Sequence, residues 1–430
     1  MQGKPAVEGL ETLTKRSSSM TEQPRSESVA EVDKVLAPTQ EIDIPDGGLQ
    51  AWLSVLGGWL VSFCAFGFAS SFGVFEAYYV NAGTSSSSNI SWIGSLQFFF
   101  LFAMGLPAGK LFDEGYYRFE LAFGSLFLVF CMMMLSLADP TKYYQLILSQ
   151  GIGIGIGSGL LLVPALSIQS HHWRRKRSLV MGIVLSGASF GGILYPIMLN
   201  QLFNNGVGFA WGVRAAGFMT LGFLVVANCV LRTRLPSARE RRKVAGGRDL
   251  PKPRIRDILT DTPYLWMSVD RQYTDFYLQL WIAILNASSI IGRTVPNAIS
   301  DRIGTLNTLA PLAVITGALV FVMFAATTPG AVIVFAILYG AFSGGFIAML
   351  PPTLASMSRS PDEIGIRIGF GYCFCSLAML TGTPISGALL GPQDDWAKPI
   401  IFSGIVLLAG AACIGYARVL VARRKGSRRV

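Results

Sequence analysis

Two related stretches decide the fold. Residues 105–118 have the sequence GLPAGKLFDEGYYR, and residues 292–304 have the sequence GRTVPNAISDRIG. Each begins with glycine near the end of an apolar run and then has an aspartate, Asp113 or Asp301, followed by an arginine. The same motif in both halves of a chain indicates that the fold is built from two related units.

The chain around these motifs is too apolar for a soluble protein. Of its 430 residues, 52% are hydrophobic and 14% are charged, whereas soluble chains carry roughly a quarter charged residues. This composition excludes a soluble enzyme, a coiled coil and a disordered scaffold. Eleven apolar runs are long enough to cross a membrane as helices, and without a two-residue alternation they exclude a barrel. The runs cover 50–79, 91–110, 119–138, 143–170, 178–203, 209–231, 276–299, 306–327, 330–351, 364–391 and 399–420.

The basic residues orient the chain in the membrane. The net charge is +10, and the lysines and arginines gather at 174–177, 232–262 and after 417, while the alternate loops carry almost none. Cytosolic loops carry the excess of Lys and Arg, so we expect both termini to lie in the cytosol. We expect the protein to lie in the plasma membrane. The positive charge of these loops then lies next to anionic lipid, and it is explained without a nucleic-acid partner, so we expect none.

These observations predict an all-α, polytopic membrane protein of two six-helix halves. We expect a disordered cytosolic tail followed by an N-terminal half of helices 1–6, a basic cytosolic linker, an incomplete C-terminal half and a basic cytosolic tail. The corresponding ranges are 1–44, 45–231, 232–262, 263–420 and 421–430.

The seventh helix poses a problem. The charge pattern beyond 262 requires the chain to cross the membrane once between 262 and 276. Residues 263–275 are too short to span, and Asp270, Arg271 and Asp275 are costly in lipid. We therefore expect eleven full spans with the seventh helix largely missing, through either a real loss or an incomplete gene model.

The motifs resemble those of the major facilitator superfamily. Gly109, Leu111, Asp113 and Arg118 correspond to that family's Gly-x-Leu-x-Asp-x-x-Gly-x-x-Arg turn, with Gly115, and Arg118 after it, one place early. More narrowly, the chain resembles the fungal monocarboxylate-porter-like branch through three further stretches. They are 45–52 (PDGGLQAW), 172–196 (from HWRRKRS to the Tyr-Pro pair) and 286–293 (NASSIIGR).

The resemblance implies a transport site but departs from the family's coupling residues. Animal members pair a helix-1 lysine with an aspartate and an arginine in helix 8. The arginine is matched by Arg293, but the lysine position falls near Ser70 and the acid position is Ser289. Proton–monocarboxylate coupling therefore does not carry over directly.

Arg293 is the main candidate for substrate binding or coupling. Charges inside a membrane span usually face a cavity or a partner, although an arginine can also extend to the cytosolic interface. Asn286 lies two helical turns earlier on the same face, and Tyr195 is a further candidate for a polar contact with substrate. The alternative for each polar residue is helix packing.

Asp113, Arg118, Asp301 and Arg302 are candidates for gating. A carboxylate can accept hydrogen bonds at a helix N-terminus, where the dipole favours negative charge, and such a bond stabilises one state of a transport cycle. The alternative is a solvated turn.

Glycines four apart in 151–159, 187–191 and 340–344 predict close helix packing. The six cysteines, all within apolar runs, are expected to pack without disulfides.

Asn89 begins an Asn-Ile-Ser acceptor for glycosylation in a predicted outer loop.

Two histidines and the scattered acids predict neither a metal site nor a cofactor. We expect a monomeric secondary transporter, not an enzyme, for a monocarboxylate-like anion or a specialised metabolite. Proton coupling is one option. The alternatives are a transporter-derived protein impaired by loss of helix 7 and, less favoured, a membrane receptor.

Overall fold

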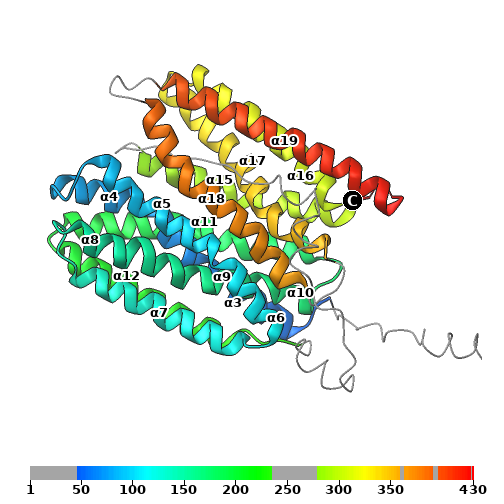
Figure 1. The fold of residues 1–430 in the computed structure, drawn as a ribbon, viewed down its shortest axis with the longest axis horizontal. Helices are drawn as coiled ribbons and strands as arrows, with labels where there is room; N and C mark the ends of the chain where they lie inside the picture. Colours follow the sequence, from blue (N-terminus) through cyan, green and yellow to red (C-terminus); the bar gives the residue numbers. More distant parts are fainter. Residues whose placement is uncertain (1–45, 235–277, 359–362, 391–395, 428) are drawn as a thin grey trace, which may run out of the picture. The chain divides into compact units, whose positions relative to one another are not determined.

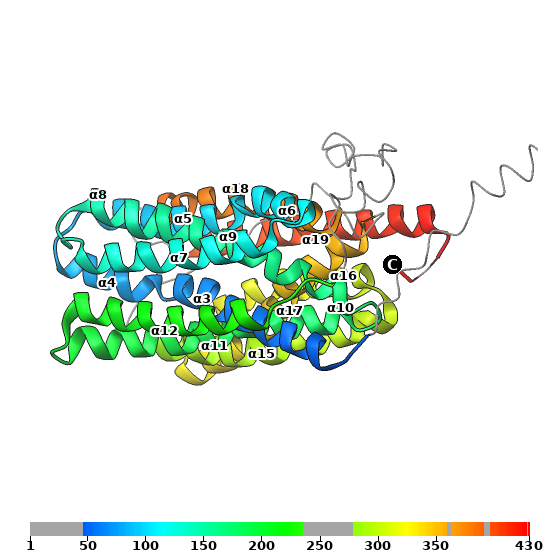
Figure 2. The same cartoon turned by 90° about the horizontal axis from the view of Figure 1, so that it is seen from below.

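The computed structural model describes residues 46–234, 278–358, 363–390, 396–427 and 429–430. Helices connected by short turns make up this part of the chain, and it contains no strand. The chain divides into two units, Met1–Ile44 and Pro45–Val430. All described residues belong to the second unit. The prediction of an all-α protein is confirmed (Figures 1 and 2).

The N-terminal helices form six passes along the bundle. Several passes consist of two or more consecutive helices: α3 with α4, α5 with α6, and α8, η1, α9 and α10 together. η1 is a π-helix in the glycine-rich run. The bounds are α3 Leu49–Ser70, α4 Phe72–Asn81, α5 Ser87–Ala103, α6 Gly105–Glu114, α7 Tyr117–Leu137, α8 Tyr143–Leu146, η1 Ile147–Ile154, α9 Gly155–Ser167, α10 Gln169–His172, α11 Arg177–Asn204 and α12 Gly208–Val230.

The C-terminal helices follow in the yellow-to-red part of Figure 1. They are α15 Leu278–Ile303, α16 Thr305–Val322 with the short 3₁₀ helix η3 Met323–Ala325, α17 Pro329–Ser356, α18 Ile364–Leu390 and α19 Ala397–Lys425. α15 packs against α17 and against α11 of the N-terminal half, and α16 packs against α19.

Ten helical segments of the described residues are long and apolar enough to cross a membrane. They coincide with ten of the eleven predicted runs. The remaining run, 276–299, corresponds to α15, which is helical over 26 residues but is not among those ten. The predicted count of eleven spans is therefore not confirmed.

The predicted seventh helix lies outside the described residues, as does the tail 1–44 for which disorder is predicted. The flanking helices are informative. The end of α12 lies beside α3, because the Gln50 side chain donates to the Val230 carbonyl at 3.0 Å. α15 begins at the opposite end of the bundle, because it runs antiparallel to α11. The truncation of helix 7 stays a prediction.

The glycines predicted to pack do so. A Cβ on Gly155 would lie 2.8 Å from the Gln97 carbonyl, and one on Gly159 would lie 2.7 Å from the Leu101 carbonyl. Gly187 lies closer still to the backbone of α3, and Gly340 to the backbone of α15. Small residues allow such close approach of membrane helices. The six cysteines all lie in described residues and none forms a disulfide there.

Candidate functional site

The two halves meet along two helix pairs. α11 packs against α15, and α5 and α6 pack against α18. We call the first the polar seam (Ser178–Gly192 of α11 with Asn286–Asp301 of α15) and the second the glycine seam (Gly105–Asp113 with Gly365–Tyr372). Figure 2 shows α11 beside α15, and α5 and α6 beside α18.

Side-chain hydrogen bonds cross the polar seam. The Asn286 amide donates to the Gly192 carbonyl at 3.5 Å. One turn further along α15, the hydroxyls of Ser289 and Ser189 lie 2.6 Å apart. Both serines are buried. Satisfied polar contacts of this kind hold two membrane helices in one register, because a slip would leave buried groups without partners.

Arg293 is the charged residue at the centre of this seam. Its Nη1 donates to the Leu185 carbonyl of α11 at 2.9 Å, and its Nε donates to Ser289 Oγ at 3.2 Å. The side chain is half-buried. A guanidinium has five N–H donors, so these two bonds do not exhaust its capacity.

The polar seam residues occupy one face of α15. Asn286, Ser289, Arg293, Asn297 and Asp301 follow at intervals of three or four, which places them on one helical stripe. Asn297 is buried, donates to the Arg293 carbonyl at 2.7 Å and lies against Gly182 of α11. A Cβ on Gly182 would collide with the Arg293 carbonyl.

Asp301 ends this stripe at the N-terminus of α11. Its carboxylate oxygens accept hydrogen bonds from the backbone N–H groups of Ser178 at 3.0 Å and Leu179 at 2.9 Å. The first N–H groups of a helix lack intrahelical partners, and the macrodipole adds a partial positive charge there. The carboxylate from one half therefore binds the helix end of the other half.

Asp113 makes the equivalent contact at the glycine seam. It accepts hydrogen bonds from the backbone N–H groups of Gly365 at 3.3 Å and Ile366 at 2.9 Å, in the first turn of α18. Both contacts lie at the same end of the bundle, because the Phe112 ring, next to Asp113, packs at a tilt against His171 of α10, with ring centroids 5.3 Å apart, and α10 ends just before α11 begins. We call this end, which carries Arg174–Arg177, the basic end. Two carboxylates thus join the halves there.

Between Asp113 and the centre, the glycine seam has backbone packed on backbone. A Cβ on Gly109 would overlap the Gly365 carbonyl, and one on Gly369 would overlap the Gly105 carbonyl. Further in, Tyr372 is buried and packs edge-on against Phe102 at 5.1 Å. Contact here depends on the absence of side chains.

The other predicted gating residues lie away from these contacts. Arg118 and Arg302 are exposed, and neither side chain forms a hydrogen bond or ion pair with another described residue. Arg118 instead lines a pocket between α7 and α12. Their gating role stays a prediction.

Two predicted substrate residues are not brought to Arg293. Tyr195 is buried within the N-terminal half, where its hydroxyl lies 2.6 Å from Thr220 Oγ1 of α12 and its ring packs on Phe63 and Phe68. Ser70 is half-buried at the last residue of α3. Both assignments stay predictions without contacts to support them.

Asn89 is exposed in the first turn of α5. Its amide donates to Ser85 Oγ at 2.9 Å, and the hydroxyl of Ser91 donates to Glu76 Oε1 at 2.7 Å. Glycosylation at this acceptor stays a prediction. Over the same described ranges, the His, Cys, Asp and Glu side chains form no group of three placed to hold a metal ion.

Several residues at the seams were not predicted. Ser189 faces Ser289, and Gly365 and Gly369 form the α18 side of the glycine seam. An ion pair also lies at the start of α18, between Nε of the buried Arg367 and Oε2 of the half-buried Glu363 at 3.0 Å. The four-residue spacing of the two glycines was a visible signal, whereas the partner of Ser189 required the helix pairing.

The sequence and the fold can be compared with those of known proteins. A family model described as Major Facilitator Superfamily matches residues 58–291, more than half of the chain. The chain is 40% identical to the aspyridones efflux protein apdF of Emericella nidulans, over 91% of this chain and 82% of that protein. It is 36% identical to the agnestins efflux protein AgnL12 of Paecilomyces divaricatus, over 86% and 88% respectively.

A solved structure supports the fold alone. The crystal structure of the human organic anion transporter MFSD10 (TETRAN) superposes with a TM-score of 0.62, covering 86% of this chain and all of that one, at 14% sequence identity. The arrangement of helices is therefore shared although the sequences have diverged.

Proposed function

Because the chain belongs to the major facilitator superfamily, we propose that it exports a small organic metabolite by alternating access. It is a multi-pass membrane transporter of small organic solutes and not an enzyme. Export is the direction named for two of its relatives, the aspyridones and agnestins efflux proteins. The monocarboxylate-porter branch is a finer assignment that these relatives do not require.

The observation that carries the mechanism is the pair of carboxylates at the basic end. Asp113 and Asp301 each accept two backbone hydrogen bonds from the opposite half. We propose that these contacts hold the basic end closed and break when the halves rock apart. Each half provides one helix N-terminus and one carboxylate, and we call the two contacts the latches. Because both latches join the same two halves, rocking the halves apart breaks them together.

The polar seam supports an anionic cargo. Arg293 places a positive charge between the halves, with hydrogen bonds to both helices of the seam. A bound anion would compete with the Leu185 carbonyl for the guanidinium and weaken the seam. Cargo binding and rocking are then linked through one residue. We propose an ion gradient as the energy source, with protons as the first candidate.

The charge pattern supports an orientation with the basic end on the cytosolic side and both termini in the cytosol. We also propose that the chain works as a monomer in the plasma membrane. Protease accessibility of tags at the two termini in intact and permeabilised cells tests this orientation. Digestion of either tag in intact cells would contradict it.

Deletion of the gene in its native host tests export. Untargeted mass spectrometry of cells and medium should show one or more metabolites lost from the medium and accumulated in the cells. Restoring the gene should reverse both changes. Loss of uptake of a medium component, with no change in secreted metabolites, would instead indicate import.

Paired variants test the latches. Asp113→Asn and Asp301→Asn keep the side-chain size but remove the charge, weakening each latch by about 1–2 kcal/mol. We expect each variant to open the basic end more often and to slow transport, and the double variant to do both more strongly. Unchanged transport and unchanged accessibility of the basic end in the double variant would exclude gating by these residues.

A further inference from the structure

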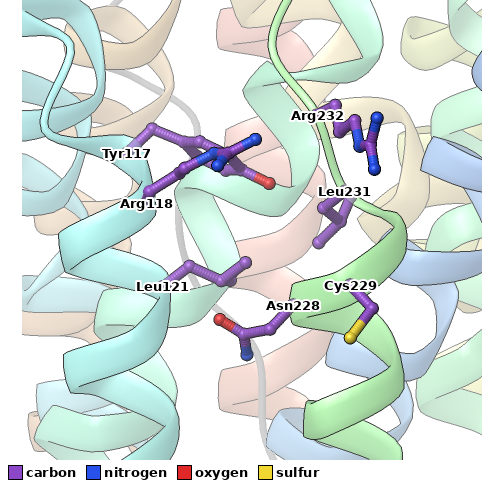
Figure 3. A pocket seen from close by; sticks show the side chains of 7 residues that line it. All are labelled: Tyr117, Arg118, Leu121, Asn228, Cys229, Leu231 and Arg232. Carbon is purple, nitrogen blue, oxygen red and sulfur yellow. The ribbon is translucent and has the colours of Figure 1, made fainter.

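A pocket lies at the basic end of the N-terminal half, away from both seams. It has a volume of about 430 Å³ and opens between the start of α7 and the end of α12. Its lining consists of Tyr117, Arg118, Leu121, Asn228, Cys229, Leu231 and Arg232 (Figure 3). No part of the transport mechanism above uses this pocket.

The α7 wall presents a helix N-terminus and two polar side chains. Tyr117 and Arg118 are the first two residues of α7, and no side chain caps this helix end. The macrodipole of a 21-residue helix therefore favours an anion here. Tyr117 is buried, at 2% exposure, and its hydroxyl has no hydrogen-bond partner among the described residues. A buried hydroxyl without a partner is costly unless a ligand or water satisfies it.

The opposite wall holds the second arginine at a fixed position. The His172 ring nitrogen Nε2 donates to the Arg232 carbonyl at 2.9 Å, and Gln50 donates to the Val230 carbonyl at 3.0 Å. These bonds also occupy carbonyls at the end of α12, which would otherwise repel an anion. The exposed Arg232 side chain lies across the pocket from Arg118 (Figure 3).

The floor of the pocket is also fixed. Asn228 of α12 donates to Ser125 Oγ of α7 at 2.9 Å and to the Leu224 carbonyl at 2.8 Å. These bonds join the two helices below the arginines. The remaining lining residues, Leu121, Cys229 and Leu231, add apolar surface, which suits the glycerol and upper acyl carbons of a lipid.

The charge of the pocket is positive. Two arginines line it and no acidic residue does. The neighbouring acid, Glu120, is buried at 2% exposure and is not part of the lining. Arginine forks match phosphate oxygens with paired hydrogen bonds, and basic pockets between membrane helices on the cytosolic side bind anionic head groups.

We propose that this pocket binds a phosphate-bearing anion, with the head group of an anionic glycerophospholipid as its occupant in the membrane. The phosphate lies between Arg118 and Arg232 near the α7 N-terminus, and Tyr117 donates its hydroxyl hydrogen to a phosphate oxygen. A small soluble phosphate ester shares this chemistry and is the other source. The proposal does not depend on the transport mechanism.

Native mass spectrometry of the delipidated full chain tests the proposal. Phosphatidic acid and phosphatidylcholine are titrated separately against the wild type and a double variant, Arg118→Gln with Arg232→Gln. We expect the wild type to prefer phosphatidic acid, and the double variant to bind it at least about tenfold more weakly, since each lost charged hydrogen bond is worth a tenfold change or more. Competition with millimolar glycerol phosphate separates the two sources: competition indicates a soluble phosphate site, and its absence indicates the lipid.

A matched control removes the same charge elsewhere. Lys176→Gln with Arg423→Gln changes two exposed cationic residues outside the pocket, and we expect it to bind phosphatidic acid like the wild type. Equal weakening by both double variants would reduce the effect to general surface attraction and overturn the proposal. Equal binding of phosphatidylcholine would overturn it as well.

Two further variants guard against misfolding. Arg118→Lys with Arg232→Lys keeps the charge but loses the planar fork, and we expect intermediate affinity with unchanged elution in size-exclusion chromatography. If the glutamine pair does not elute as a single species, the single variants provide the same comparison. Wild-type affinity in both single variants would contradict the assignment of the phosphate to these arginines.

Discussion

The two seams join the same halves by opposite means. In the glycine seam, Gly109 and Gly369 allow the backbones of α6 and α18 to touch. In the polar seam, Ser289 and Arg293 reach α11 through side-chain hydrogen bonds. Both seams end in a carboxylate on a helix N-terminus at the basic end. Related halves can therefore share a closing contact while one interface depends on shape and the other on chemistry.

The difference bears on how each seam opens. Backbone packing is short-ranged, so a glycine seam loses its contacts within a small separation. A seam with a charged residue offers partners that a bound anion can replace. We therefore expect substitutions in the polar seam to affect cargo, and those in the glycine seam to affect the balance between closed and open states.

Arg293→Ala is the change with the largest expected effect. It removes the guanidinium that we propose binds the anion, and two charge-assisted hydrogen bonds to the cargo are worth together about 3 kcal/mol or more, so transport of an anionic cargo should fall roughly a hundredfold. Flux of the metabolite identified by gene deletion, measured in vesicles, checks this. Arg293→Lys should retain part of the flux, because it keeps the charge.

Arg423→Ala is the control for Arg293, since it removes an exposed arginine outside both seams. Both variants should insert into the membrane like the wild type. Undiminished flux in Arg293→Ala would remove this residue from the mechanism and leave the polar seam with a packing role.

Gly109→Ala should open the basic end by steric overlap. The new Cβ would meet the Gly365 carbonyl, and overpacking of this kind costs about 1–3 kcal/mol in the closed state. The distance between spin labels on Lys176 and Arg423 should lengthen in double electron–electron resonance. Alanine favours a helix over glycine by about 1 kcal/mol, so destabilisation would come from the collision.

Gly222→Ala is the matched control for the glycine seam. This glycine is exposed on α12, and a Cβ there meets nothing within 4 Å. Its spin-label distances should equal those of the wild type. The same shift in both variants would mean that the collision at Gly365 is not its cause.

Removing the serine pair should have the smallest effect. Ser189→Ala breaks one hydrogen bond, worth about 1 kcal/mol, whereas Ser289→Ala also removes the acceptor of Arg293 Nε. We expect a larger loss of flux in Ser289→Ala, and the double variant to be no worse than the sum of the two. An equal loss in both single variants would show that the contact between Ser289 and Arg293 contributes nothing.

The amino-acid order predicted most of the fold and part of the site. Ten of the apolar runs form helices long and apolar enough to cross a membrane, as expected because a bilayer admits few alternatives to a helix. The aspartates of the two motifs were recognisable because each follows a glycine-rich helix end. Arg293 stood out because an isolated charge in an apolar run needs a partner.

What the order of residues could not supply was the partner of each group. Ser189, Gly365 and Leu185 became identifiable only once α11 and α18 were paired with helices from the other half. By sequence alone, Tyr195 is a polar residue in an apolar run as Asn286 is, but in the fold its hydroxyl lies against Thr220. Orientation about a helix axis decides this, and it depends on neighbours distant in the chain.

By itself, the sequence determined a bundle of membrane helices in two related halves, because hydrophobic length and repeated motifs are local properties. The tertiary structure alone decided which helix ends the two aspartates bind, which glycines touch, and that Arg118 and Arg232 share a pocket. These outcomes depend on distances between segments far apart in sequence, which arise only when the helices pack.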